Sequence, residues 1–269
     1  MLYERDFRIL SADEIKTWKK ARGKFTKSRK NGVVTPRDIV KYHDSIPSAI
    51  LHYESLFPNN YLNPQLLNEP KKLKKIKKLF KELLDKKSRE RDIINFIRDN
   101  KAYFIIASIL KSHFTFGHHG AFLFSEFGFP PNHKIDYLLA GKNSGGYEFV
   151  FVELESCNGQ TTTKEGEFGS AIRKGIKQVG DWNMWLDSNY SHLRLEFSKH
   201  LGSVEKLPDE FFQLDKSRIH FVVLSGRRNH FKQKTYHLKR KLKKESNILL
   251  LHYDNLVDCV NLLLKTYEF

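Results

Sequence analysis

Two apolar segments that each contain acidic residues constrain the possible folds of this chain more than any other feature. Residues 135–140 and 147–155 are strongly apolar and are separated by a short glycine-rich turn, which predicts two adjacent strands. The first segment contains Asp136, and the second contains Glu153 and Glu155. Residues two apart on a strand point to the same face, so Glu153 and Glu155 should share one side. Pairing of the two strands would bring Asp136 beside them.

The pattern after residue 101 predicts a regular series of elements. It reads as helix, three strands, helix, strand, helix, strand and helix, at 101–112, 121–129, 135–140, 147–155, 170–186, 218–224, 232–245, 248–253 and 256–265. Short connections between the first three strands favour an antiparallel meander, and helices before the later strands favour parallel crossovers. The predicted fold class is therefore α/β, with a mixed central sheet flanked by helices on both faces.

Residues 1–99 read as a separate helical and loop-rich region whose role the sequence does not assign. Ser11-Ala-Asp-Glu resembles a helix start, because a capping serine is followed by early acids. The stretch 23–36 is polar, basic and weakly patterned, which favours a loop. Residues 71–99 are predicted to be helical, with an apolar stripe surrounded by lysines.

The charge of the chain is strongly basic. A formal net charge of +16 and an isoelectric point of about 9.6 favour a polyanionic partner, namely DNA, RNA or anionic lipid. Much of the charge lies in 71–87 and 232–244, although a solvated helix face is the alternative explanation there.

Compartment is predicted from the cysteines and the apolar runs. Cys157 and Cys259 make no disulfide framework and are expected to be reduced thiols. The first residues lack a signal-peptide pattern, and the longest apolar run, 102–110, is too short to span a bilayer. We therefore expect a cytoplasmic protein with no membrane partner.

The clustered acids point to metal chemistry. Glutamate is rarely buried unpaired, and neighbouring carboxylates repel each other unless a proton or cation joins them. Carboxylate oxygens suit Mg²⁺ or Mn²⁺. A structural Asp136 at a strand start and a salt-bridged Glu153 are the alternatives. Metal-dependent phosphodiester chemistry is the first hypothesis.

Asp136, the turn and Glu153-Leu154-Glu155 together resemble the PD-(D/E)xK nuclease signature. The resemblance implies a restriction-endonuclease-like fold, in which Asp136, Glu153 and the backbone carbonyl of Leu154 bind Mg²⁺ or Mn²⁺. In that family a lysine, which usually assists the attacking water, stands where this chain has Glu155.

Further segments of the sequence point to one family among the nucleases with this signature. Residues 153–155, 171–186, 219–228 and 248–256 are similar, in the same order, to the Shedu antiphage nuclease family, over about residues 100–260. This resemblance implies a nuclease-like domain at 100–269. It also implies a homo-oligomeric endonuclease or nickase that cuts DNA in bacterial antiphage defence.

The missing lysine leaves three hypotheses open. Glu155 itself orients water or binds a second metal ion. Alternatively Lys174, four residues before Gln178 and on the same helix face, supplies the ammonium, with Lys164 as a less favoured candidate. Finally, the chain is a catalytically degenerate nucleic-acid-binding or assembly protein. The resemblance places Gln178 beside the metal site.

Three other charged residues complete the candidates. Arg227 and Arg228 follow a strand, where a phosphate contact and a solvated loop are equally plausible. Glu126 is a possible further acid near the site, although a turn or edge position explains it better.

Overall fold

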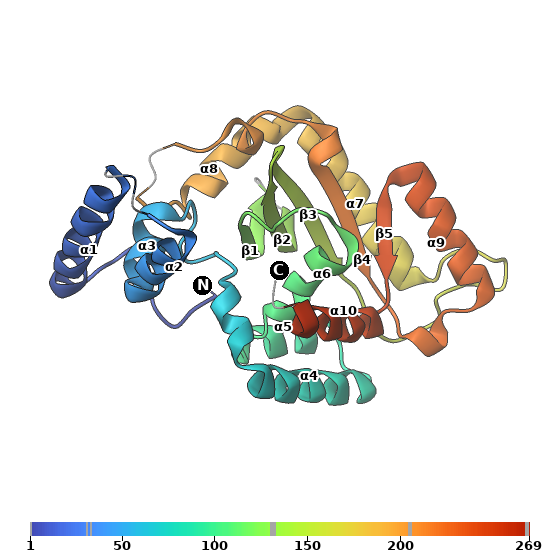
Figure 1. Cartoon of the computed structure of the whole chain (residues 1–269). Helices are drawn as coiled ribbons and strands as arrows, with labels where there is room; N and C mark the ends of the chain where they lie inside the picture. The colour runs from blue at the N-terminus through green and yellow to red at the C-terminus, as the bar shows by residue number, and fades with distance from the viewer. Residues whose placement is uncertain (1, 31, 33, 130–132, 204–205, 267–268) are drawn as a thin grey trace.

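A five-stranded mixed sheet forms the centre of the molecule (Figure 1). The fold is seen in a computed structural model, which describes residues 2–30, 32, 34–129, 133–203, 206–266 and 269. The first three strands pair antiparallel, and the last two are added parallel to β3. In spatial order the strands are β1 (Ala121–Phe129), β2 (His133–Asn143), β3 (Gly146–Leu154), β4 (Ile219–Leu224) and β5 (Ile248–Leu251). The predicted meander and crossovers are confirmed.

Helices cover both faces of the sheet, as predicted. Side chains alternate along β3, so Phe149 and Phe151 enter one core while Val150 and Val152 enter the other. The helices α7 (Ser170–Asn189) and α8 (Leu193–Ser198) close the phenylalanine side. The valine side is closed by α4 (Pro70–Asp85), α5 (Glu90–Asp99), α6 (Phe104–His113) and α10 (Tyr253–Thr266). The remaining helix, α9 (Gln233–Ser246), packs beside β5 at the sheet edge.

Three N-terminal helices form a small core of their own. These helices are α1 (Ala12–Lys30), α2 (Pro36–Ser45) and α3 (Pro47–Glu54), packed around Trp18, Tyr42, Ile46 and Ala49. The predicted start at Ser11 is confirmed, because Ser11 and Glu14 cap each other's backbone N–H.

The loop predicted at 23–36 is wrong for its first part. The helix α1 continues to Lys30, since Phe25 stacks on Tyr42 of α2 with ring centroids 4.5 Å apart. That tertiary contact outweighs the weak local pattern.

The helical stretch predicted at 71–99 consists of α4 and α5 with a turn between them. Lys87 adopts a left-handed φ of 55° in this turn, so the helix cannot continue. The apolar residues of both helices, including Phe80 and Ile93, share the core beneath the sheet. The helices α4 and α5 thus pack with the sheet, although they precede residue 99. The domain division at residue 99 stays a prediction.

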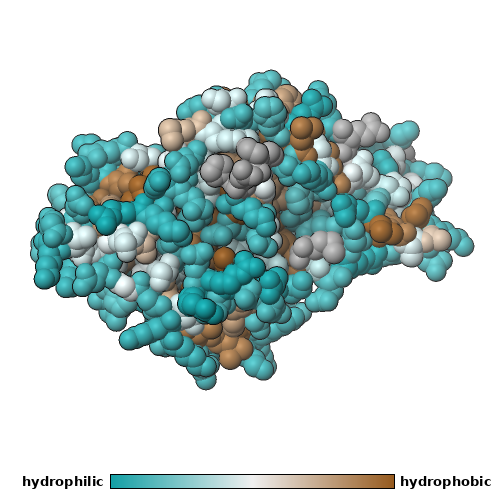
Figure 2. Space-filling view, turned by 180° about the vertical axis from the view of Figure 1, so that it is seen from behind, coloured by the Kyte–Doolittle hydropathy of each residue, from teal (hydrophilic) through white to brown (hydrophobic). Residues whose placement is uncertain are grey.

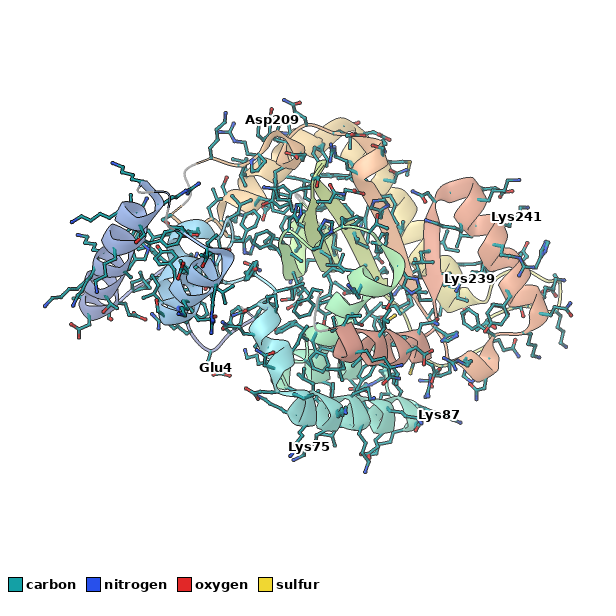
Figure 3. All side chains as sticks on the ribbon, in the orientation of Figure 1. Glu4, Lys75, Lys87, Asp209, Lys239 and Lys241 are labelled. Atoms are coloured by element: carbon teal, nitrogen blue, oxygen red, sulfur yellow. The ribbon has the colours of Figure 1, made fainter. Side chains whose placement is uncertain are left out.

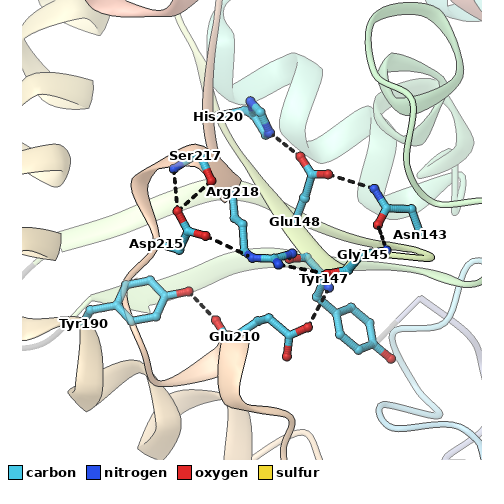
Figure 4. Close-up of polar contacts among 10 residues, drawn as sticks. All are labelled: Asn143, Gly145, Tyr147, Glu148, Tyr190, Glu210, Asp215, Ser217, Arg218 and His220. Carbon is cyan, nitrogen blue, oxygen red and sulfur yellow. Dashed lines mark hydrogen bonds and ion pairs between the residues drawn. The ribbon is translucent and has the colours of Figure 1, made fainter.

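A polar network ties down the β2–β3 turn at one end of the sheet (Figure 4). The Arg218 guanidinium donates to the backbone carbonyl of Tyr147, and the Glu210 carboxylate accepts from the Tyr147 N–H at 3.1 Å. On β3, Glu148 pairs with His220 at 2.8 Å. These contacts fix the hairpin register that positions the acids at the other end of β3.

The outer surface is mainly hydrophilic in the view from behind (Figure 2). Within the described ranges, no helix is both long enough and apolar enough to cross a bilayer.

Candidate active site

Three carboxylates gather at the end of β3, on the face that α7 covers. The antiparallel register pairs Tyr137 with Val152, and one further step places Asp136 opposite Glu153. Strand alternation puts Glu153 and Glu155 on the same side as the phenylalanines of β3. The predicted proximity of the three acids follows from this register.

Hydrogen bonds hold the end of β3 between its neighbours. The Leu154 N–H donates to Oδ2 of Asp136 at 2.8 Å, which links β2 to β3 beyond the last regular pair. The Glu155 N–H donates to the Leu224 carbonyl at 2.8 Å, and the Tyr253 hydroxyl donates to the Glu155 carbonyl at 2.7 Å. The backbone at the site is therefore fixed from both sides.

Burial and crowding raise the proton affinity of these acids. Glu153 and Glu155 are each 3% exposed, and Oε2 of Glu153 has no hydrogen-bond partner among the residues described. Burial, with the nearby charges of Asp136 and Glu155, raises the pKa of Glu153 to about 9. Burial also raises the pKa of Asp136 to about 7, and the Leu154 N–H opposes this shift. Such a pair binds either a proton or a cation at neutral pH.

Lys174 of α7 reaches the acid cluster. Its Nζ lies 2.9 Å from Oε1 of Glu155 and 3.8 Å from Oε2 of Glu90. Burial lowers the pKa of Lys174, but the hydrogen bond to Glu155 and the charges of both glutamates outweigh this and raise it overall. Of the alternatives for the missing lysine, Lys174 is thus the ammonium that the fold brings to the acids.

A glycine allows α7 to approach this closely. A Cβ on Gly175 would lie 2.8 Å from Cγ1 of Val223 and 3.0 Å from Cγ of Glu155, both tighter than ordinary contacts. The absence of a side chain at Gly175 therefore sets the spacing between α7 and β3.

Sequence reasoning missed Glu90. It lies in the first turn of α5, contacts Lys174, and its charge raises the pKa of both Asp136 and Glu153. Acids are common in first turns because they favour the helix dipole, so the sequence carried no signal for a role at the site.

No hydrogen bond or ion pair joins the side chain of Gln178 or Lys164 to the acids in the described part of the chain. Gln178 is one turn beyond Lys174 on α7 and is partly buried. Lys164 lines a cavity of about 440 Å³ with Lys232 and Lys234, and no ion pair joins it to a described carboxylate.

Comparison with known protein families shows where the chain belongs. A family model described as Shedu protein SduA, C-terminal, matches residues 87–257, which is more than half of the chain. The chain belongs to the Shedu family. No curated protein matches it. The Shedu match begins at residue 87, so it includes Glu90 and the whole acid cluster and leaves α1–α4 outside.

The two candidate arginines of this Shedu protein are engaged with acids. The Arg227 guanidinium, 15% exposed, lies 2.8 Å from Asp254 and 2.9 Å from Asp85. Arg228 pairs with Asp258 and is more exposed. Through these ion pairs Arg227 joins α4 to α10. A nucleic-acid contact for either arginine stays a prediction.

Glu126 lies at a bend of β1. It has a left-handed φ of 50° and pairs with Lys134 at 3.5 Å and Arg91 at 3.8 Å. Because these two cations satisfy its carboxylate, the structure gives it no place among the three clustered acids.

One feature of the site suits a hard divalent cation, and another limits the number of side-chain ligands that such a cation would have. Oε2 of Glu153 is a buried carboxylate oxygen without a partner in the described chain, which a metal ion would satisfy. No group of three His, Cys, Asp or Glu side chains in the described part of the chain is placed to hold a metal. A metal here would depend on Asp136, Glu153 and the Leu154 carbonyl, with water completing its coordination.

Proposed function

We propose that this Shedu protein is a metal-dependent nuclease that hydrolyses DNA phosphodiester bonds. Family membership suggests a role in antiphage defence. The observation that best supports nuclease chemistry is the unpartnered, buried Glu153 carboxylate beside Asp136, with the Lys174 ammonium held next to Glu155. This set would combine a divalent-cation site with an ammonium that orients water, which suits metal-assisted phosphodiester hydrolysis.

Each residue at the site would have a distinct role. Asp136, Glu153 and the Leu154 carbonyl would hold Mg²⁺ or Mn²⁺. When bound, the metal would lower the pKa of a water and offset negative charge on the phosphate. The Lys174 ammonium would orient the attacking water, and Glu155 would position Lys174 through their 2.9 Å contact.

The substrate is proposed from the basic surface. Lysines project outward from α4 and α9, as Lys75 and Lys241 show in Figure 3. Lys87 ends the α4 surface close to the segment that follows β3, because Asn158 hydrogen-bonds the Lys87 carbonyl at 2.8 Å. Backbone phosphates of DNA would bind here without readout of base sequence. Assembly into a homo-oligomer, as the family resemblance implied, is part of the same proposal.

A cleavage assay tests the proposal. Plasmid and linear DNA are incubated with the full chain and Mg²⁺ or Mn²⁺, using wild type, Asp136→Asn and Glu153→Gln. We expect both variants to lose at least about a hundredfold in rate, as loss of metal-held water implies. Glu148→Gln, on the same strand but in the network at its other end, should cleave like wild type. Equal rates in all four proteins would refute the site.

A second candidate function rests on the state of Lys174. Two carboxylates, Glu155 and Glu90, already surround its ammonium, which suits a protein that binds DNA without cutting it. Steep salt-dependent binding with no cleavage by wild type under any divalent ion would favour this candidate over the nuclease.

A further inference from the structure

The N-terminal helices line an open cavity that the proposed nuclease site does not use. Its volume is about 710 Å³, within the range of small-molecule sites. It lies among α1, α2 and α3, outside the residues that the Shedu model matches. The side chains that matter for its chemistry are four aromatic residues and two arginines: Trp18, Phe25, Tyr42, Tyr53, Arg22 and Arg29.

Stacked aromatic pairs form two parts of the wall. The rings of Trp18 and Tyr53 have centroids 3.8 Å apart and planes 19° apart. The rings of Phe25 and Tyr42 have centroids 4.5 Å apart and planes 12° apart. Within each pair one face of each ring is covered by the other ring, and the Arg22 guanidinium also lies over Trp18. A planar aromatic ligand would therefore stack on an outer ring face, such as that of Phe25, and such stacking tolerates any base.

The two arginines add an anion-binding function. The Arg22 guanidinium lies 4.7 Å from the Trp18 ring centroid, and neither Arg22 nor Arg29 pairs with a carboxylate in the described ranges. Arg218 and Arg227 elsewhere in the chain do form such pairs. Unpaired guanidiniums beside a cavity are suited to phosphate.

An acidic group completes the cavity. Glu54 lines it together with His43, and their side chains are 4.0 Å apart. A carboxylate in this position accepts a hydrogen bond from an amino group, which aromatic bases carry.

We propose that this cavity binds a nucleotide, with the base against the aromatic wall and the phosphate on Arg22 and Arg29. The nucleotide would be either free in solution or part of a DNA strand, because both sources present the same chemistry. The site is distinct from the acid cluster and does not depend on the nuclease proposal.

Calorimetric titration of the full chain tests the proposal with the four nucleoside monophosphates and with ribose 5-phosphate, which lacks a base. We expect at least one nucleotide to bind at least about tenfold more tightly than ribose 5-phosphate. Arg29→Gln should weaken that binding about tenfold, the value of one charge-assisted hydrogen bond. Phe25→Leu, which removes one ring of the aromatic wall, should weaken it several-fold. The matched control Arg194→Gln on α8, outside the cavity, should bind like wild type.

A single-stranded oligonucleotide separates the two sources. If its affinity falls in Arg29→Gln relative to Arg194→Gln while no mononucleotide binds, the nucleotide comes from a strand, and the proposal holds in that form. The proposal is wrong if ribose 5-phosphate binds as tightly as every nucleotide. It is also wrong if Arg29→Gln and Phe25→Leu leave both mononucleotide and oligonucleotide binding unchanged.

Discussion

At the scale of single residues, Glu153 is the side chain at the site whose charged form is most unfavourable. Its carboxylate is buried, lacks a hydrogen-bond partner for Oε2 in the described chain, and lies opposite a second acid. Natural proteins seldom keep such a group without a function, because burying it costs free energy whenever it ionises.

The first prediction concerns pH. The pKa of Glu153 is about 9 in the folded protein, against an ordinary value of 4.5. Between these values the unfolded chain has lost the proton and the folded protein keeps it, so stability falls as pH rises. Without divalent ions, Glu153→Gln should therefore raise the free energy of unfolding at pH 8 by on the order of 2 kcal/mol. At pH 4 the gain should vanish.

Thermal melts at both pH values measure this effect. Glu148→Gln is the control, since Glu148 lies on the same strand in a satisfied network with His220. If the Glu153→Gln protein melts below wild type at pH 8, the buried carboxylate does not destabilise the folded protein, and the prediction is wrong.

The second prediction concerns divalent ions. A metal that binds the folded state alone stabilises it, so millimolar Mg²⁺ or Mn²⁺ should raise the melting temperature of wild type. Asp136→Asn and Glu153→Gln each remove a proposed ligand and should abolish the increase. An equal increase in all three proteins would place the ion elsewhere.

At the scale of elements, the close approach of α7 to β3 brings Lys174 to the acids. Gly175 makes that approach possible, whereas Gly180 on the same helix faces open space. Gly175→Ala should push α7 outward and lower the cleavage rate at least about tenfold, since small displacements of catalytic groups are costly.

Gly180→Ala is the matched control. It should leave cleavage unchanged and stabilise the protein by about 0.5–1 kcal/mol, because alanine favours helix. Equal cleavage by the two alanine variants would show that helix spacing does not control the site.

The same elements show how far sequence reasoning extends. Alternation along β3 was enough to place Glu153 and Glu155 on one face, and helical periodicity placed Lys174 and Gln178 together. Contacts between distant segments were not predictable: Glu90 reaches Lys174 through the packing of α5 against the sheet, and α1 extends to Lys30 because Phe25 meets Tyr42. Local patterns determine which way a side chain points, while tertiary packing determines what it meets.

At the scale of the whole molecule, much of the net charge of +16 lies on the outward faces of α4 and α9. Removing one lysine that binds a phosphate should reduce the slope of log affinity against log salt by about 0.9 for duplex DNA. Lys241→Gln with Lys244→Gln on α9 should therefore weaken DNA binding and flatten its salt dependence. Fluorescence anisotropy over a salt series measures this slope.

Lys16→Gln with Lys20→Gln on α1 provides a control of equal charge change. It should alter the slope less, since α1 lies at the opposite end of the molecule from α9 (Figure 1). If both pairs change the slope equally, net charge rather than a defined surface governs binding.

The central claim is that Asp136 and Glu153 together hold a divalent cation. Anomalous diffraction from crystals soaked in Mn²⁺ tests it most directly. We predict one peak about 2.0–2.3 Å from an oxygen of each carboxylate, within the usual range for hard divalent cations. A soaked crystal with Mn²⁺ bound elsewhere and none between Asp136 and Glu153 would contradict the claim.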